Sequence, residues 1–452
     1  RSVAIIGVSS NFKKAGSPIL KNMLDFGFKG KVYPINPRLN SIMGLPVHAS
    51  VKDIEGQVDL AIISTPPKTV PSILTECSEK KIKAVIINSE GFAETGEEGR
   101  KLQQEVANIL KSAGIRALGP NTIGVVCPSK GLSTSTVDLR QIKEGNVAFV
   151  TQSGLFAGGM LQHIANSELF GLSTAVSLGN KVDIDESDAL EFLADDDKTE
   201  VIGLYIEGIK DGRKFIHTAK MANAKKPVIL VKGGRTPRGA QAALSHTASL
   251  ATDDKILDAA LKQAGIIRAN GFCDLMDTIT AFAFQPLPKG KRVAIVSGSG
   301  AYGIIAVDSC ISYGLEIANF KPETTARLLE VMEENSKVRN PIDIYPAAVK
   351  HGRSKVFETS LDAVLGDEGV DTAIVITWVG GDNMVPECII APARRHPEKP
   401  VLVSVYGSSA SEFRRILGEA RVPAYTFAEL AVIALSRMYK YAAYKKSLEN
   451  LS

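Results

Sequence analysis

The chain has 452 residues, 44% of them hydrophobic and 23% charged, with a formal net charge of +4. This is ordinary globular composition for about two to four domains, and so mild a charge argues against a nucleic-acid partner or a membrane surface. The five isolated cysteines, without a C-x-x-C pair, favour a reduced cytoplasm and no zinc site; no apolar run reaches the roughly 18–20 residues that cross a bilayer.

Short β-branched runs alternate with helical patterns along the whole chain, a pattern typical of parallel α/β domains. The first domain is expected to span residues 1–128, and its first residues already read as a strand rather than a signal peptide. A second domain follows over residues 129–288 and a third over residues 289–452. The strands expected in the first domain, spaced as in a doubly wound sheet, cover residues 3–6, 32–35, 60–64, 84–87 and 116–118.

The second and third domains look like copies of one fold. VAFVTQSGLF at 147–156 aligns with VAIVSGSGAY at 293–302, and KPVILV at 226–231 aligns with KPVLVS at 399–404. After these matched strands the copies differ in length: 33 residues, 232–264, lead to the next strand in the second domain, and 15 residues, 406–420, do so in the third. A long insertion in one copy of a fold favours a functional segment, since folding did not require it.

That insertion coincides with residues 233–251, GGRTPRGAQAALSHTASLA, which contain His246. The stretch has three cations, many small residues and little apolar periodicity, so it is predicted to be a loop rather than a packed helix. A single histidine in a polar segment is more often a solvated surface residue. Because His246 lies in a segment that only one of the two copies contains, a functional role becomes the favoured interpretation, and His246 is a candidate functional residue.

Two strand-to-helix turns are candidate anion sites. TQSG at 151–154 and SGSG at 297–300 each follow a buried-type strand and precede a helix, whose free N–H groups favour an anion. Glycine and serine are also ordinary turn residues, so each turn alone is weak evidence. Two related domains that aim such helices at one phosphate make a stronger case.

The turns of the first domain do not predict a nicotinamide site. Its first turn is GVSS at 7–10, and its second strand ends in PINPR at 34–38, without the acidic residue that binds a ribose hydroxyl. A nucleotide with a phosphorylated ribose, such as coenzyme A, suits Asn36 and Arg38 better. GSGAYG at 298–303 matches a dinucleotide fingerprint but lacks the same acid, and the sequence contains no P-loop for ATP.

Three motifs together resemble the nucleoside-diphosphate-forming acyl-CoA synthetases, relatives of succinyl-CoA synthetase, and in particular the α subunits of archaeal ADP-forming enzymes. They are GPNTIGV at 119–125, QSG at 152–154 and SHTA at 245–248. The resemblance covers essentially the whole chain. It implies a Rossmann-like CoA-binding domain followed by two duplicated, flavodoxin-like ligase domains, each doubly wound.

The resemblance also implies roles for individual residues. His246 occupies the place of the phosphorylated histidine, and Glu207, at the end of a strand, matches a carboxylate that contacts it. Phosphate is expected between the two helix starts and is attributed to Gln152, Ser153, Gly154, Ser299, Gly300 and Asn121. CoA or acyl-CoA is expected at the carboxyl ends of the first-domain strands and is attributed to Gly7, Ser9, Ser10, Asn36, Arg38, Thr65, Pro66, Ser89 and Glu90.

The implied reaction is acyl-CoA + ADP + phosphate ⇌ acid + CoA + ATP, by way of an acyl phosphate and a phosphohistidine. The family needs an ATP-grasp module for ADP or ATP with Mg²⁺, which implies a β subunit, in an α2β2 assembly. Small residues near the phosphate site hint at a small acid such as acetate. Two other functions compete with this one: a CoA-binding regulatory or scaffold subunit without activity, disfavoured by the intact SHTA motif, and a nicotinamide dehydrogenase, disfavoured by the missing acids.

Overall fold

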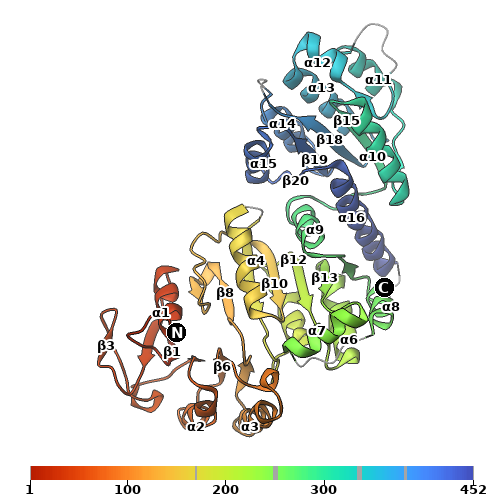
Figure 1. Cartoon of the computed structure of the whole chain (residues 1–452). Helices are drawn as coiled ribbons and strands as arrows, with labels where there is room; N and C mark the ends of the chain where they lie inside the picture. Colours follow the sequence, from red (N-terminus) through yellow and green to blue (C-terminus); the bar gives the residue numbers. More distant parts are fainter. Residues whose placement is uncertain (1, 168–169, 248–252, 333–337, 381–383, 451–452) are drawn as a thin grey trace. The chain divides into compact units, whose positions relative to one another are not determined.

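The computed structural model describes residues 2–167, 170–247, 253–332, 338–380 and 384–450. These residues form three main sheets of predominantly parallel strands with flanking helices, which confirms the predicted α/β class (Figure 1). The chain separates into two compact units, Arg1–Arg268 and Ala269–Ser452. The first unit contains two of the three sheets, and the second contains the third.

The first sheet has the strand order β2-β1-β5-β6-β7, with all neighbours parallel. Alternate residues of each strand face opposite sides: Ile5 packs in one core cluster with helix α1, and Ile6 packs in another with helices α2 and α3. Burial of both faces explains the continuous β-branched runs. The elements are β1 Ser2–Ile6, α1 Gly16–Asp25, β2 Lys31–Ile35, β5 Leu60–Ile63, α2 Val70–Glu79, β6 Ala84–Ile87, α3 Glu97–Ala113 and β7 Arg116–Leu118.

The second sheet has the order β14-β13-β12-β10-β11-β8-β9. Its five parallel strands carry the flavodoxin-like order, and two short antiparallel strands, β8 and β9, extend it beyond β11. Sequence patterns did not indicate these two strands, which are only three and two residues long. The elements are β8 Val125–Cys127, β9 Leu132–Ser133, β10 Glu144–Thr151, α4 Gly154–Ser167, β11 Leu172–Ser177, α5 Glu186–Ala194, β12 Val201–Ile206, α6 Gly212–Lys225, β13 Val228–Lys232, α7 Pro237–Thr247, α8 Asp254–Gln263 and β14 Ile267–Arg268.

The third sheet has the order β16-β15-β18-β19-β20, with β17 beside β15. Its strand order repeats that of the parallel strands in the second sheet, as the duplicated sequence motifs predict. Figure 1 shows the long helix α16 beside α9, where Tyr441 meets Phe282 edge to face. The elements are α9 Phe272–Phe284, β15 Arg292–Ser297, α10 Gly300–Ser312, β16 Glu316–Ile317, α11 Pro322–Leu329, β17 Ile342–Asp343, α12 Tyr345–His351, α13 Arg353–Leu365, β18 Thr372–Trp378, α14 Glu387–Arg395, β19 Val401–Tyr406, α15 Ala410–Glu419, β20 Ala424–Tyr425 and α16 Ala428–Glu449.

None of the helices in the described ranges is both long enough and apolar enough to cross a bilayer.

Candidate active site

The carboxyl ends of the first-sheet strands bring the predicted CoA residues to one edge. Strands β1, β2, β5 and β6 run parallel, so the turns that follow their last residues lie side by side. Ser10, Arg38, Pro66 and Glu90 are exposed there, whereas Ser89 is buried. The structure therefore groups the predicted residues, but contact with CoA stays a prediction for each of them.

Gly7 shows why the first turn needs glycine. Its φ is +100°, and a Cβ atom at this position would lie 2.3 Å from the carbonyl oxygen of Ser64. The turn then closes onto helix α1, because the Ser9 N–H donates to Ser17 Oγ at 2.7 Å and that hydroxyl donates back to Ser9 O at 2.6 Å. These two hydrogen bonds fix the backbone between β1 and α1.

Several predicted CoA residues already have hydrogen-bond partners within the protein. The Asn36 amide donates to Val8 O at 2.5 Å and accepts from Arg38 N at 2.7 Å, which fixes the turn after β2. Ser89 Oγ accepts from Thr65 N at 3.1 Å and donates to Ile63 O at 3.4 Å. These groups shape the edge of the sheet, at which Arg38 is exposed.

Asn121 lies where the first sheet meets the second. It has a φ of +60°, its N–H donates to Ser89 O at 2.9 Å, and its side-chain amide approaches Asn180 Oδ1 at 3.5 Å. Two residues later the chain passes Gly154 at the start of α4, where an added Cβ would lie 3.6 Å from Ile123 N. The 119–125 motif therefore connects the predicted CoA edge to a predicted phosphate turn.

A buried network lies beneath the start of α4. Gln152 Oε1 accepts hydrogen bonds from the N–H groups of Glu207 and Gly208, at 2.8 and 3.2 Å, and from Lys181 Nζ at 3.2 Å. The Lys181 ammonium also donates to Glu186 at 2.9 Å and to Gly208 O at 2.6 Å, and both charged side chains are almost fully buried. Gln152 thus holds the end of β12 through its side-chain oxygen, and its contact with phosphate stays a prediction.

Glu207 lies at the carboxyl end of β12 and is buried. Its Oε1 accepts a hydrogen bond from the Tyr205 hydroxyl at 3.1 Å. Burial, followed by the charge of Glu207 and this hydrogen bond, raises the pKa of Tyr205, so the phenol stays protonated as a donor. The chain toward α7 passes directly against this pair, because a Cβ at Gly233 would lie 2.7 Å from the Tyr205 hydroxyl and 3.3 Å from Glu207 Cγ.

The predicted loop at 233–251 is wrong over most of its length, because residues Pro237–Thr247 form helix α7. The Thr236 hydroxyl accepts from Gly239 N at 3.1 Å, and proline is well suited to a first helical position. Alanine and glutamine then favour the helix without an apolar stripe. His246 lies in the last turn of α7; its side chain and residues 248–251 lie outside the described part of the structure.

Helix α7 also contacts the carboxyl edge of the first sheet, called here the CoA edge after the residues predicted to bind CoA, where it lies against the short 3₁₀ helix η3, Ala93–Thr95. Within η3, Glu94 Oε1 accepts from Gly91 N at 2.7 Å, and Oε2 accepts from the Asn180 amide at 2.6 Å. Burial alone would raise the pKa of Glu94, but hydrogen bonds from Asn180 and backbone N–H groups hold it below its usual value. Glu94 is therefore ionised, and its carboxylate links Gly91 at the CoA edge to Asn180 in the second domain.

The second predicted helix start belongs to the other unit. Helix α10 begins at Gly300, and Ser299 directly precedes it. Both residues line a cavity of about 680 Å³, together with Asp343, Tyr345, Arg353 and Trp378. The Asp343 carboxylate lies near Gly300, where an added Cβ would be 2.8 Å from its Oδ2. The pairing of this turn with Gly154 at one phosphate stays a prediction.

Sequence patterns did not identify Glu94, Asn180, Lys181 or Tyr205. The only local signal was the strand-end position of Tyr205, two residues before Glu207 and on the same strand. Lys181, by contrast, has partners 5, 27 and 29 residues away, and a lysine in a loop ordinarily predicts a solvated side chain. Among the described residues, no group of three or more His, Cys, Asp or Glu side chains is arranged to hold a metal ion.

Comparisons with known proteins match the whole chain. Residues 1–128 match the CoA binding domain family, and residues 144–282 match the family described as succinyl-CoA ligase like flavodoxin domain. The chain is 39% identical over 435 residues to acetate–CoA ligase (ADP-forming) II subunit alpha of Pyrococcus furiosus, a match that covers 94% of this chain and 93% of that one.

A second relative is longer than this chain. Acetate–CoA ligase (ADP-forming) II of Archaeoglobus fulgidus is 40% identical over 448 residues, which are 98% of this chain but only 66% of the relative. Among solved structures, dinucleotide forming acetyl-coenzyme A synthetase 1 of Ca. Korarchaeum cryptofilum, in complex with phosphate and ADP, superimposes with a TM-score of 0.92 at 32% identity. That match covers 100% of this chain and 97% of the other.

Proposed function

The chain belongs to the family of ADP-forming acetate–CoA ligase alpha subunits, relatives of succinyl-CoA ligase, and from this premise we propose that it converts acyl-CoA, phosphate and ADP to acid, CoA and ATP. The geometry that best supports this function is the meeting of three features in the first unit. The CoA edge of the first sheet, the α4 start at Gly154 and the base of helix α7 are joined through Asn180, Lys181 and Glu207.

In the first step, a phosphate oxygen attacks the thioester carbonyl, the C–S bond breaks, and the CoA thiolate leaves and takes up a proton. The N–H groups of Ser153, Gly154 and the following turn are the donors offered to phosphate, at the positive end of α4. The start of α10 at Ser299 and Gly300 is proposed to bind phosphate by the same kind of N–H donors. The CoA edge carries the other product, with Arg38 at a phosphate of CoA.

In the second step, the imidazole of His246 attacks the phosphorus of the acyl phosphate, and the free carboxylate leaves. A neutral imidazole is a competent nucleophile near pH 7, and a carboxylate on its other ring nitrogen fixes the tautomer and stabilises the positive charge that develops. We propose Glu207 for that carboxylate on the strength of the resemblance; Gly233, in the segment that leads into α7, passes directly against it. Tyr205 then holds the Glu207 carboxylate by its 3.1 Å hydrogen bond.

In the last step, ADP accepts the phosphoryl group from His246, and the N–P bond breaks. We propose that an ATP-grasp module binds ADP and Mg²⁺, and that a β subunit supplies this module in an α2β2 assembly. The name of the Pyrococcus relative, a subunit alpha, supports a second subunit, whereas the length of the Archaeoglobus relative fits one longer polypeptide. Acetate is the proposed acid, since both relatives are named for it.

ATP formation tests the proposal. The purified chain, mixed with a family ATP-grasp subunit, acetyl-CoA, ADP, Mg²⁺ and phosphate, should form ATP with release of one CoA thiol per ATP. Omission of phosphate or of the ATP-grasp subunit should abolish ATP formation. CoA binding without either product would favour the scaffold function instead, and thiol release without ATP under complete conditions would contradict the proposed phosphoryl transfer to ADP. Replacing acetyl-CoA with butyryl-CoA or phenylacetyl-CoA then measures the preferred acyl group.

Arg38→Ala is expected to raise the KM for CoA in the direction of acyl-CoA synthesis about tenfold with little change in kcat, because one charge-assisted contact to a phosphate is lost. Lys83→Ala is the matched control, since Lys83 is an exposed cation just before β6, at the opposite edge of the same sheet. Steady-state kinetics at fixed ionic strength measure both values. An equal change of KM in the two variants would mean that Arg38 acts only through overall charge.

A further inference from the structure

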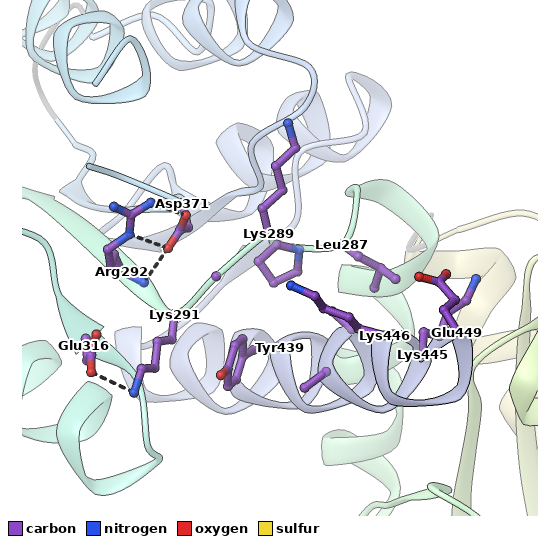
Figure 2. Close-up of a pocket in the computed structure, with 14 residues that line it drawn as sticks. Leu287, Lys289, Lys291, Arg292, Glu316, Asp371, Tyr439, Lys445, Lys446 and Glu449 are labelled. Carbon is purple, nitrogen blue, oxygen red and sulfur yellow. Dashed lines mark hydrogen bonds and ion pairs between the residues drawn. The ribbon is translucent and has the colours of Figure 1, made fainter. Parts of the chain in front are cut away.

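A cleft of about 770 Å³ lies in the second unit, away from every residue assigned above (Figure 2). One wall is the linker that leads into β15, residues 287–292, and the other is the last part of α16. Arg292 begins β15, Glu316 begins β16 and Asp371 directly precedes β18. The cleft therefore opens at the amino-terminal edge of the third sheet, whereas Gly300 lies at the carboxyl edge.

Two ion pairs fix the linker wall. The Arg292 guanidinium donates to both oxygens of Asp371, at 2.8 and 2.9 Å, and the Lys291 ammonium lies 2.7 Å from Glu316. Gly290 passes so close to Asp371 that an added Cβ would lie 2.3 Å from its Oδ2. The linker thus has little freedom to collapse into the cleft, and these two cations are already neutralised.

Three lysines remain in the lining: Lys289 on the linker, and Lys445 and Lys446 on α16. Within the described ranges, none of their ammonium groups has an ion pair with a carboxylate. Figure 2 shows the Lys446 side chain in the space between the linker and the helix. The lining has one further acid, Glu449, so three ammonium groups stand against one carboxylate. Such an excess of positive charge in a concave surface attracts a ligand with several negative charges.

The rest of the lining is apolar or aromatic. Leu287 and Pro288 come from the linker, Ala442 and Ala443 from α16, and the ring of Tyr439 lies on the same helix face (Figure 2). The volume lies in the range of about 300–1,000 Å³ that is typical of small-molecule sites. A ligand that satisfies both parts of the lining has a chain of phosphates for the lysines and a flat base for Tyr439 and the alanines.

We propose that this cleft is a second nucleotide site, which binds a nucleoside diphosphate through Lys289, Lys445 and Lys446 and places the base against Tyr439. The site is independent of the histidine chemistry and of the ATP-grasp module. ADP is also a reactant in the proposed reaction. The fraction of clefts that hold ADP would therefore follow the ADP concentration, at the edge of the third sheet opposite Gly300.

Calorimetric titration of ADP into the full chain, without any ATP-grasp subunit, tests the proposal at low ionic strength. The double variant Lys289→Gln/Lys446→Gln should bind ADP at least about tenfold more weakly. Lys440→Gln is the matched control, because Lys440 is an exposed lysine on α16 that does not line the cleft. AMP and inorganic pyrophosphate should each bind about tenfold more weakly than ADP, since one lacks a phosphate and the other lacks the base.

CoA contains an ADP-like portion, so the CoA edge needs its own control. The double variant should keep the CoA affinity of the parent chain, and Arg38→Ala should leave ADP binding at the cleft in place. The proposal is overturned if ADP does not bind, if the double variant binds it as the parent does, or if Lys440→Gln weakens binding equally. Pyrophosphate binding as tight as that of ADP would overturn the assignment of a nucleotide. None of these results depends on whether the chain forms ATP.

Discussion

His246→Asn is expected to lower the rate of ATP formation by on the order of 10³-fold or more and to leave CoA affinity unchanged. The amide of asparagine has no lone pair able to accept a phosphoryl group under these conditions, so the transfer to ADP loses its carrier. The first step does not use the imidazole, and phosphate-dependent release of CoA from acetyl-CoA should persist until acetyl phosphate accumulates. Coupled assays for ATP and for free thiol separate the two steps.

His217→Asn is the matched control for this variant. His217 is exposed on α6 of the same domain, and no role in the reaction is assigned to it. Its replacement should leave both steps at the parent rate. Equal loss of both steps in His246→Asn would instead indicate that the substitution disturbs α7 or the neighbouring CoA edge, and parent-like ATP formation would remove the residue from the reaction.

Lys181→Met should cost the first unit about 3–5 kcal/mol of stability, because the substitution leaves the Glu186 carboxylate buried without its counter-ion. The side chains of the pair are only 3% and 1% exposed, and the ammonium also serves Gln152 and Gly208. Methionine is unbranched and only one atom shorter than lysine, so the change is mainly one of charge. Hydrogen exchange at the amides of β10 and β12 measures the effect locally, which is preferable to one global transition in a chain of several domains.

Two comparisons keep this result interpretable. The double variant Lys181→Met/Glu186→Gln should recover part of the loss, because the second change removes the unpaired charge. Lys198→Met breaks an exposed ion pair with Glu144, whose side chains are 52% and 53% exposed, and should leave exchange unchanged within error. Fluorescence of Trp378, the single tryptophan and a residue of the second unit, should be the same in all variants. Unchanged exchange in Lys181→Met would refute the structural role of the buried pair.

The sheets were predictable from sequence because their strands are buried on both faces. Residues 3–6 and 84–87 were predicted as strands, and the structure has β1 at Ser2–Ile6 and β6 at Ala84–Ile87. A continuous β-branched run between turn residues has few other interpretations in a chain of alternating elements. The duplicated motifs likewise predicted two sheets of the same order, since a repeated sequence repeats its burial pattern.

Helix α7 was missed for the opposite reason. Periodicity detects a helix that buries one apolar face, and the described side chains of α7 are exposed or only half-buried. The features that favour this helix are the Thr236 cap, Pro237 and a run of small, helix-favouring residues. The same small residues, judged by composition alone, led to the prediction of a loop. Residue 246 is therefore carried by a helix rather than by a loop.

The buried Lys181 network could not be found in one sequence, because its members are brought together only by the fold. The Lys181 ammonium joins the loop after β11 to α5 and to the residues that follow β12. Nothing adjacent to Lys181 in the chain marks it as buried. The turns at 151–154 and 7–10 were found because each combines glycine or serine with a preceding strand, and that local chemistry is the same in every protein.

The most direct measurement is phosphorylation of the purified chain with acetyl-CoA and radiolabelled phosphate, in parallel with His246→Ala, with and without the ATP-grasp subunit. The expected label on the protein is labile in acid and stable in base, is absent from the variant, and is removed by ADP when the ATP-grasp subunit is present. A chain that stays unlabelled beside an active ATP-grasp subunit, or a variant that keeps the label, would contradict a phosphohistidine at His246 and leave the CoA-binding scaffold as the better account.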